Sequence, residues 1–382
     1  MRIAVFCPNL VGDTVMATPT FRTLRMSFPN ARLIALIRPH LAPLLAGSNW
    51  FDEVIAADHR SARRSERTLA LIRRLRGERP EIAVLLPNSF RVALTALLAG
   101  IPRRLGYVRY GRGPLLTDRL QPARDPSGRL LPTPIVESYL ALARRLGCRP
   151  DSLRLELATT DEDEAAIDRV YAALGLACDE AVVVLNGGGA YGPAKDWPSE
   201  SFAALARRLA REAGVFVLIL CGPAERAAAA RIEELAGHPR VVSLARWTPS
   251  LGLSKACLRR ASLLVTTDSG PRHLATAFQT PVITLFGPTH IAWTRTYHSQ
   301  GVHVVHPVEC GPCQRRVCPQ GHHRCMRGID PDQVAALALR MLGSILAAEG
   351  GKARWAEHHG KRSSPEVSSP VGLAGSESWR RG

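Results

Sequence analysis

The chain has 382 residues, and its 50 Lys and Arg against 33 Asp and Glu give a formal net charge of +17 at pH 7. Hydrophobic residues make up 46% and charged residues 22%, a globular composition that excludes a largely disordered chain. At about 100–200 residues per domain, the length predicts two domains. The apolar runs have the length of strands and fall short of the roughly 18 residues that span a bilayer.

The first residues, MRIAVFCPNL, have the pattern of a strand and lack the charged, apolar and cleavage regions of a secretory signal. We therefore expect a cytoplasmic protein, in which the nine cysteines do not form disulfides. All but four of the 50 basic residues are arginine. A positive charge of this size favours an anionic partner, such as a nucleic acid, a phosphorylated substrate or an anionic membrane.

The first half of the chain alternates between apolar strands and helices. Strands are predicted at residues 2–7, 32–38, 53–56 and 82–86, and helices at residues 14–28, 65–76, 91–98 and 136–146. This alternation predicts a parallel sheet with crossover helices.

A second unit of the same kind follows the charged stretch 159–180, which begins TTDEDEAA like the N-cap and acidic first turn of a helix. Strands are predicted at residues 181–185, 215–221, 241–243, 262–266 and 281–286, and helices at 199–213, 224–236, 251–260 and 271–278. The fold class is therefore α/β, with two doubly wound, Rossmann-like domains (1–160 and 161–345) facing each other across a cleft and a disordered Gly/Ser/Pro-rich tail (346–382). Ligands of such sheets bind at the carboxyl ends of the strands.

Two loops after predicted strands indicate chemistry. Pro8–Thr14 leads from the first strand into a helix, and Asp13 lies at or near the helix N-cap, where it either caps the helix or acts as a general base. The loop 186–198 (NGGGAYGPAKDWP) is rich in glycine, which lets backbone amides approach a phosphate closely. Lys195 is a compact positive charge in a chain that otherwise uses arginine. A flexible surface loop with a solvated lysine is the alternative.

Two further loops follow strands of the second unit. Ser269 and Gly270 begin a helix whose N-terminus suits an anion, and Asp268 is placed to accept hydrogen bonds from sugar hydroxyls. His273 is either a packing residue or part of the site, and Thr289 can hydrogen-bond a ligand.

Four cysteines, Cys310, Cys313, Cys318 and Cys325, lie within sixteen residues near two histidines. In a cytoplasmic protein this pattern suggests a structural zinc or iron–sulfur site. The spacing is not that of a standard pair of C-x2-C motifs, so reduced cysteines in a C-terminal loop are the alternative.

Together these motifs make the chain resemble the family 9 glycosyltransferases, the ADP-heptose:lipopolysaccharide heptosyltransferases, and most of all their heptosyltransferase II branch. The matching stretches run in consistent order from residue 1 to about residue 345: residues 1–19, LPNSFRVALTALLAGIPRRLGY (86–107), GAYGPAKDWP (189–198), DSGPRHLATAFQTPVITLF (268–286) with Gly287-Pro288-Thr289, and CGPCQRRVCPQGHHRCM (310–326). Two departures concern the donor site: Arg272 stands where a Met is more usual, and Asn186-Gly187-Gly188 replaces a more usual Pro-Gly.

The resemblance implies a GT-B fold and inverting transfer of L-glycero-D-manno-heptose from ADP-heptose to the heptosyl-Kdo-lipid A inner core of lipopolysaccharide, with no cofactor and no essential metal. It implies that Asp13 is the base and that Lys195 holds the diphosphate. The remaining donor-binding residues that it implies are Gly189, Tyr191, Gly192, Glu225 (for the ribose), Asp268, Ser269, Gly270, His273 and Thr289. The acceptor-binding residues that we expect are Asn88, Ser89, Arg63, Arg64 and Arg109.

The acceptor is anionic and lies in the inner leaflet, so we expect a peripheral protein on the inner face of the inner membrane. Some arginines of the N-terminal half are expected to face that membrane and the acceptor phosphates; the alternative is an ordinary solvated surface. The candidates are Arg60, Arg63, Arg64, Arg73, Arg74, Arg103, Arg104, Arg109 and Arg112.

Three other functions were weighed. A nicotinamide-dependent oxidoreductase lacks support, because the loop after the first strand is PNLVGD and contains no GxGxxG. Nucleic-acid binding fits the charge but no recognition motif, and aromatic residues are only 5% of the chain. A family 9 transferase with a different nucleotide sugar or acceptor is the remaining alternative.

Overall fold

The computed structural model describes residues 1–58, 63, 67–177, 180–189 and 191–348. Residues Met1–Arg340 form one compact unit, and Met341–Gly382 form a second, whose described residues are the C-terminal end of helix α12. The predicted tail at 346–382 is wrong in its first three residues, because α12 continues to Ala348. The rest of that tail lies outside the described residues.

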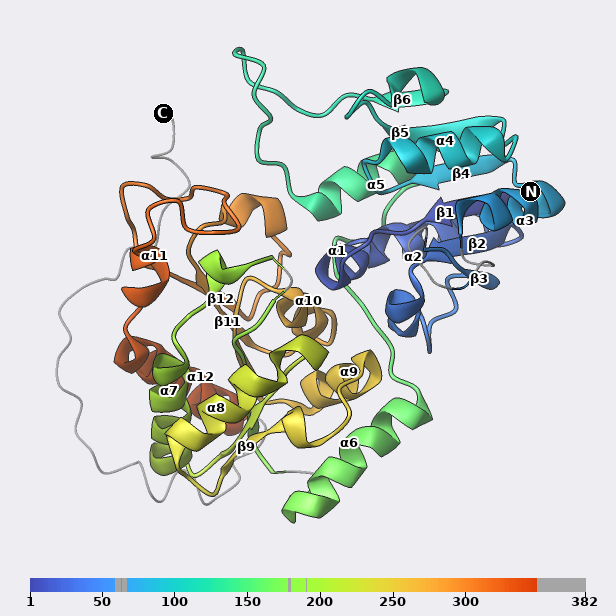
Figure 1. Ribbon diagram of the computed structural model, residues 1–382. Coiled ribbons are helices and arrows are strands. Elements are labelled where there is room, and N and C mark those ends of the chain that lie inside the picture. Colours follow the sequence, from blue (N-terminus) through green and yellow to red (C-terminus); the bar gives the residue numbers. More distant parts are fainter. Residues whose placement is uncertain (59–62, 64–66, 178–179, 190, 349–382) are drawn as a thin grey trace. The chain divides into compact units, whose positions relative to one another are not determined.

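The first sheet has six parallel strands in the order β3-β2-β1-β4-β5-β6 (Figure 1). Its strands are β1 (Arg2–Phe6), β2 (Arg32–Ile37), β3 (Glu53–Ala56), β4 (Ile82–Leu85), β5 (Arg103–Tyr107) and β6 (Asp118–Leu120). Its helices are α1 (Val11–Met16), α2 (Thr18–Ser27), α3 (Thr68–Glu78), α4 (Phe90–Leu98) and α5 (Ile135–Arg145). Both faces of the central strands are buried, since Ile3 and Val5 join one core and Ala4 and Phe6 another.

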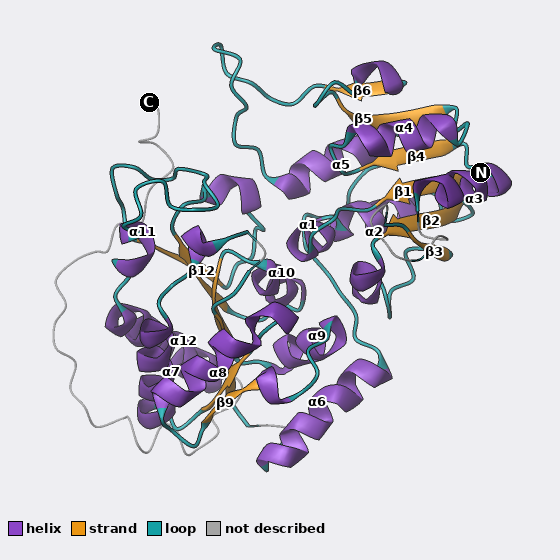
Figure 2. Cartoon of the chain, viewed as in Figure 1, coloured by secondary structure: helices purple, strands orange, loops and turns teal. Residues whose placement is uncertain are grey.

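The second sheet repeats this design, with six parallel strands in the order β12-β11-β10-β7-β8-β9. Helices flank these strands (Figure 2). Its strands are β7 (Val182–Asn186), β8 (Phe216–Ile219), β9 (Val241–Ser243), β10 (Leu263–Thr267), β11 (Val282–Phe286) and β12 (Gly301–Val305). Its helices are α6 (Asp161–Leu174), α7 (Ser199–Glu212), α8 (Arg226–Ala236), α9 (Leu251–Arg260), α10 (Gly270–Ala277), α11 (Arg324–Arg327) and α12 (Pro331–Ala348). The predicted α/β class with two Rossmann-like halves is therefore confirmed.

The predicted helix at 14–28 is two helices, because Pro19 lies in the first turn of α2. Proline has no N–H for the helical ladder and is tolerated only in a first turn, so the chain ends α1 at Met16 and begins α2 at Thr18.

The start of α6 follows the sequence pattern closely. The Thr160 hydroxyl accepts the N–H of Asp163, and the Asp163 carboxylate accepts the N–H of Thr160, forming a capping box. Asp163 also pairs with the fully buried Lys255 of α9 at 2.8 Å, and Lys255 donates to the carbonyl of Ala158. This lysine therefore fixes the chain that leads into α6 against α9.

Among the described residues, no helix combines the length and the apolar character needed to cross a lipid bilayer.

Candidate functional site

The strand order reverses at two points, between β1 and β4 in the first sheet and between β7 and β10 in the second. In open α/β sheets such a reversal opens a crevice beyond the carboxyl ends of the strands. Asp13 and Asn88 follow β1 and β4, while the Gly-rich loop and Asp268 follow β7 and β10. The topology therefore gathers the predicted site residues at the two places where such sheets bind ligands.

The centre of the second crevice is the Asp268 carboxylate, whose side chain is only 3% exposed. Its Oδ2 accepts from Lys195 Nζ at 2.7 Å and from the Thr289 hydroxyl at 2.9 Å. Its Oδ1 accepts from Arg272 at 3.0 Å and from the Thr294 hydroxyl at 3.1 Å. A carboxylate has about four acceptor positions, so protein donors occupy the ones that a sugar hydroxyl would use.

Two cations keep this carboxylate ionised. Burial alone would raise the pKa of Asp268, but the charges of Lys195 and Arg272, together with the Lys195 hydrogen bond, hold it well below its ordinary value. One carboxylate therefore pairs with two cations, the buried Arg272 and Lys195, whose side chain is 12% exposed.

Lys195 is held in a fixed orientation. Its Nζ donates to both the backbone carbonyl and Oδ2 of Asp268 at 2.7 Å, and it lies 4.3 Å from the centre of the Tyr191 ring. An ammonium group has three N–H donors. Among the described residues only two of these donors have partners, so the third remains for a ligand.

The N-terminus of α10 provides a second source of positive potential. Ser269 is its N-cap residue, but its hydroxyl contacts the Asn186 Oδ1 at 3.2 Å and the Thr266 hydroxyl at 3.1 Å instead of capping the helix. The amides of the first turn, which begins at Gly270, are left without a side-chain cap. Such a helix start favours an anion.

Helix α1 of the first half contacts α10 of the second at Gly12. A Cβ on Gly12 would lie 2.6 Å from Cδ2 of His273, so only glycine lets the α1 backbone lie against this imidazole. His273 is 3% exposed, and burial and the charge of Arg272 lower its pKa to about 3. The ring is therefore neutral near pH 7, and its buried Nδ1 has no hydrogen-bond partner.

Asp13 lies in the first turn of α1, one residue beyond Gly12. The expectation that it caps the helix is wrong: the N-cap residue is Leu10, and Asp13 is the third residue of α1. Burial and the negative charge of Asp268 raise the pKa of Asp13 to about 6, although Lys195 acts to lower it. Asp13 is thus close enough to feel both charges, and its pKa suits a general base near neutral pH.

Glu225 approaches the Gly-rich loop from the end of β8. A Cβ on Gly188 would lie 2.1 Å from the Glu225 carboxyl carbon, so the carboxylate lies directly against the loop backbone. Its Oε2 accepts the N–H of Gly222 at 2.8 Å, which leaves Oε1 for a ligand. The predicted donor residues Gly189, Tyr191 and Gly192 belong to the same loop.

Three of the predicted acceptor residues, Asn88, Ser89 and Arg109, follow β4 and β5, at the same sheet edge as Asp13. Ser89 begins α4 without a side-chain cap, and the Asn88 Oδ1 accepts from Arg112 at 2.9 Å. Arg109 lies over the Tyr110 ring, with 5.0 Å from its guanidinium carbon to the ring centre. Arg63 is exposed, whereas Arg64 and Arg60 lie outside the described residues.

Arg112 cannot face a membrane, which corrects the sequence-based expectation. Its side chain is fully buried, and it donates to the carbonyls of Tyr107 and Pro87 as well as to Asn88. It therefore ties the loop after β4 to β5. Arg103 pairs with Asp118 at 2.9 Å and Arg104 donates to the Leu115 carbonyl, so these two arginines also have partners within the fold.

The four clustered cysteines are reduced, and the charge of each of the other three acts on the Cys325 thiol. His322 Nε2 lies 3.8 Å from Cys310 Sγ. Within the described part of the chain, however, no three His, Cys, Asp or Glu side chains are arranged to hold a metal ion. The structure therefore gives the suggested metal cluster no support.

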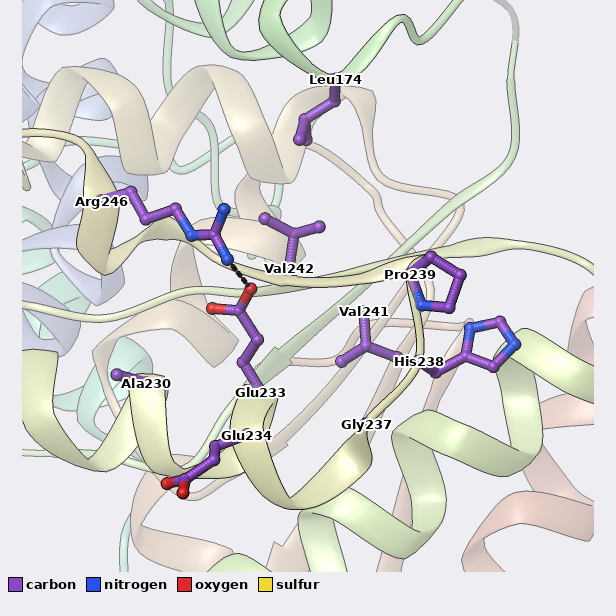
Figure 3. A pocket seen from close by; sticks show the side chains of 10 residues that line it. All are labelled: Leu174, Ala230, Glu233, Glu234, Gly237, His238, Pro239, Val241, Val242 and Arg246. Atoms are coloured by element: carbon purple, nitrogen blue, oxygen red, sulfur yellow. Dashed lines mark hydrogen bonds and ion pairs between the residues drawn. The ribbon is translucent and has the colours of Figure 1, made fainter.

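A cavity of about 570 Å³ lies elsewhere, beside β9 and α8 (Figure 3). Glu233 and Arg246 form an ion pair at its wall, and Leu174 and Val242 line it. None of the predicted site residues lines this cavity.

The sequence did not indicate Thr294, which donates to Asp268, or His303, which contacts Arg272. Both lie in a stretch without a motif, whereas Arg272 carried a signal in the sequence. The contact between Arg272 NH2 and His303 Nε2, at 3.2 Å, joins β12 to the site.

Two parallel sheets in Rossmann order, with a carboxylate of raised pKa close to two cations, match the architecture of a GT-B glycosyltransferase. The profile of glycosyltransferase family 9 (heptosyltransferase) matches residues 68–323. The chain therefore belongs to glycosyltransferase family 9.

Similar proteins and a similar solved structure are heptosyltransferases as well. Lipopolysaccharide heptosyltransferase 2 of Salmonella typhimurium is 29% identical over 370 residues, which cover 92% of this chain and 100% of that protein. Lipopolysaccharide heptosyltransferase 3 of Escherichia coli is 26% identical over 297 residues, and the match covers 74% of this chain and 81% of that protein. The solved structure of E. coli ADP-heptose lps heptosyltransferase II is 26% identical, with a TM-score of 0.72 and coverage of 91% of this chain and 99% of that one.

The shared carboxylate leads to a prediction about stability. Asp268→Asn keeps the shape of the side chain but leaves Lys195 and Arg272 buried without their counter-ion, so we expect the free energy of unfolding to fall by about 3–5 kcal/mol. The double variant Asp268→Asn/Arg272→Met also removes one of the two cations that need this counter-ion. Denaturant titration should therefore show a loss of stability in the double variant that is smaller than the sum of the losses in Asp268→Asn and Arg272→Met. Losses that add to within about 0.5 kcal/mol would contradict the coupling.

Proposed function

We propose that this protein is an inverting transferase that moves heptose from ADP-heptose to the heptosyl-Kdo-lipid A inner core of lipopolysaccharide. The observation that carries the proposal is the Asp13 carboxylate, with a pKa raised to about 6 in the field of Asp268 and Lys195. Membership of family 9 gives the class of reaction, and coverage of the whole Salmonella heptosyltransferase 2 favours that acceptor over the acceptor of heptosyltransferase 3.

The second half, residues 161–345, would hold the donor. Lys195 bonds Asp268, the residue before the N-cap of α10, so its third N–H and the uncapped start of α10 would together suit the negative charge of a diphosphate. That charge grows as the bond to the sugar breaks, so the same groups stabilise the leaving ADP. Glu225 would accept hydrogen bonds from ribose hydroxyls.

Asp268 would act as a positioning residue. Its carboxylate already receives four protein donors, so it orients Lys195 and does not need to touch the sugar. Neutral His273 would donate or accept a hydrogen bond near the diphosphate without adding charge.

The first half, residues 1–160, would hold the acceptor through Asn88, Ser89, Arg63, Arg64 and Arg109. Asp13 would take the proton of the acceptor hydroxyl as its oxygen attacks the anomeric carbon on the face opposite ADP. One C–O bond forms, the C–O bond to the diphosphate breaks, and the proton ends on Asp13.

Contact with the inner face of the inner membrane is part of the proposal. Helix α3 presents the exposed Arg73 and Arg74, and it packs beside α4, which exposes Phe90 and Leu98. Basic residues beside apolar ones suit an anionic lipid surface.

Incubation with ADP-heptose and heptosyl-Kdo-lipid A tests the function. We expect mass spectrometry to show one added heptose, and Asp13→Asn to abolish the transfer while ADP binding changes little. Arg211→Gln, at an exposed position of α7, is the matched control and should keep the wild-type rate. An Asp13→Asn enzyme with a normal rate would remove the assignment of the base.

The pKa of Asp13 also predicts the acid limb of the pH profile. The base must be ionised, so kcat/KM should fall by about tenfold per pH unit below pH 6 and level off above it. His273, whose pKa is lowered to about 3, stays neutral throughout this range and cannot supply the limb. Initial rates from pH 4.5 to 8.5 measure this acid limb of kcat/KM. A limb centred near pH 4 would contradict the assignment of Asp13 as the base.

Sedimentation with vesicles tests the membrane contact. Wild-type protein should pellet with anionic vesicles and much less with neutral ones at low salt. Arg73→Glu should weaken anionic binding by about fivefold or more, since each basic residue near such a surface contributes about 1 kcal/mol. Arg211→Glu makes the same charge change on α7 and should bind like wild type. Equal partitioning into both kinds of vesicle would count against the contact.

A further inference from the structure

A second cavity is lined by Arg272 and not by Asp268. It has a volume of about 330 Å³ and is bordered by α10, β11, β12 and the segment before β12. Four basic side chains line it: Arg272, Arg295, His298 and His303. None of the described residues that line it is acidic.

Arg272 is the buried wall of this cavity. Its side chain is 2% exposed, its NH1 donates to Asp268 and Thr294, and its NH2 contacts His303 at 3.2 Å. The guanidinium also lies over the Phe286 ring, 4.9 Å from its centre. Arg272 shares the single charge of Asp268 with Lys195, and none of the described residues that line the cavity adds a carboxylate on the other side.

Of the two histidines, His298 has a buried ring nitrogen without a partner among the described residues, and this nitrogen is an acceptor because the other one donates. A guanidinium only donates, so His303 Nε2 accepts from Arg272 and its Nδ1 carries the proton. His298 Nε2 contacts the Thr280 carbonyl at 2.9 Å and therefore donates, which leaves its buried Nδ1 unpartnered. Burial and the neighbouring arginines lower the pKa of His303 to about 4 and lower that of His298.

The acidic groups around this cavity are already engaged. Asp268 accepts from four donors, and Glu137 of α5 bonds the hydroxyl of Tyr297. Arg295 lies over the Tyr297 ring at the exposed side of the cavity, 4.9 Å from the ring centre. Two arginines thus border one polar cavity without a carboxylate of its own.

We propose that this cavity is a second anion site, which binds an oxyanion of the phosphate class between Arg272 and Arg295 and is distinct from the crevice of Lys195. Planar guanidinium groups suit such oxyanions, because each presents parallel N–H donors. Since Arg272 also bonds Asp268, an anion here would draw positive charge away from the carboxylate that orients Lys195.

A cavity of this volume is large enough for a small ligand and exceeds what a single phosphate needs. The oxyanion therefore has two possible sources, free phosphate from solution or a phosphate carried by the acceptor. Two experiments separate these sources.

The first experiment titrates the full chain with inorganic phosphate by calorimetry. Wild type should bind, Lys195→Ala should bind nearly as well, and Arg295→Gln should bind about tenfold more weakly, the effect of losing one charge-assisted hydrogen bond. Arg211→Gln, an exposed arginine far from this cavity in sequence, controls for net charge and should match wild type. Arg295 is exposed, so its replacement leaves the fold intact.

The second experiment compares KM for the phosphorylated acceptor and for the same acceptor after phosphatase treatment. If the acceptor supplies the anion, Arg295→Gln should raise KM about tenfold for the phosphorylated form only, with kcat unchanged. This result would support the site even if wild type fails to bind free phosphate.

Three results would overturn the proposal. The first is phosphate binding that is lost in Lys195→Ala and kept in Arg295→Gln, which would place the anion in the diphosphate crevice. The second is equal weakening in Arg295→Gln and Arg211→Gln, which would reveal only non-specific charge. The third is neither phosphate binding in wild type nor a selective change of KM in Arg295→Gln.

Discussion

The ion pairs of Asp268 are the interaction on which the site depends. One buried carboxylate takes hydrogen bonds from Lys195, Arg272 and two hydroxyls, and every one of these donors comes from a different segment. The Gly-rich loop after β7, helix α10, the turn after β11 and the segment before β12 therefore meet at two oxygen atoms. Buried charges are stable only when they are paired and hydrogen-bonded, so these segments hold one another in place.

The same carboxylate reaches across to the first half of the chain through its charge. The charge of Asp268 raises the pKa of Asp13 and the charge of Lys195 lowers it. Together with burial, these charges give Asp13 a pKa of about 6. The glycine at position 12 makes this possible, because it lets α1 approach His273 closely enough for the charges to interact. The α1–α10 contact is thus both a packing contact and the route by which the donor crevice tunes the proposed base.

Much of the fold followed from local patterns. Both sheets are buried on their two faces, so their central strands are continuous apolar runs that a sequence shows plainly, and the capping box at Thr160 and Asp163 marked the start of α6. Strands β5, β6 and β12 were missed, because they are only partly buried and their pairing depends on neighbours distant in sequence.

The site residues were also predictable only in part. Asp13, Lys195 and Asp268 stood out because they follow predicted strands in glycine-containing loops. What each one does depends on contacts that no local pattern reveals. Thr294, which donates to Asp268, and His303, which contacts Arg272, come from elsewhere in the chain. Arg112 is buried instead of facing a membrane, and Asp13 lies inside its helix instead of capping it.

The central claim is that the charges around Asp268 set the pKa of Asp13 across the α1–α10 contact. The most direct measurement is the titration of the Asp13 carboxyl carbon by NMR in the wild type, in Lys195→Met and in Asp268→Asn. We predict a pKa of about 6 in the wild type, a higher value without Lys195 and a lower value without the charge of Asp268. A pKa near 4 that neither substitution moves would contradict the account.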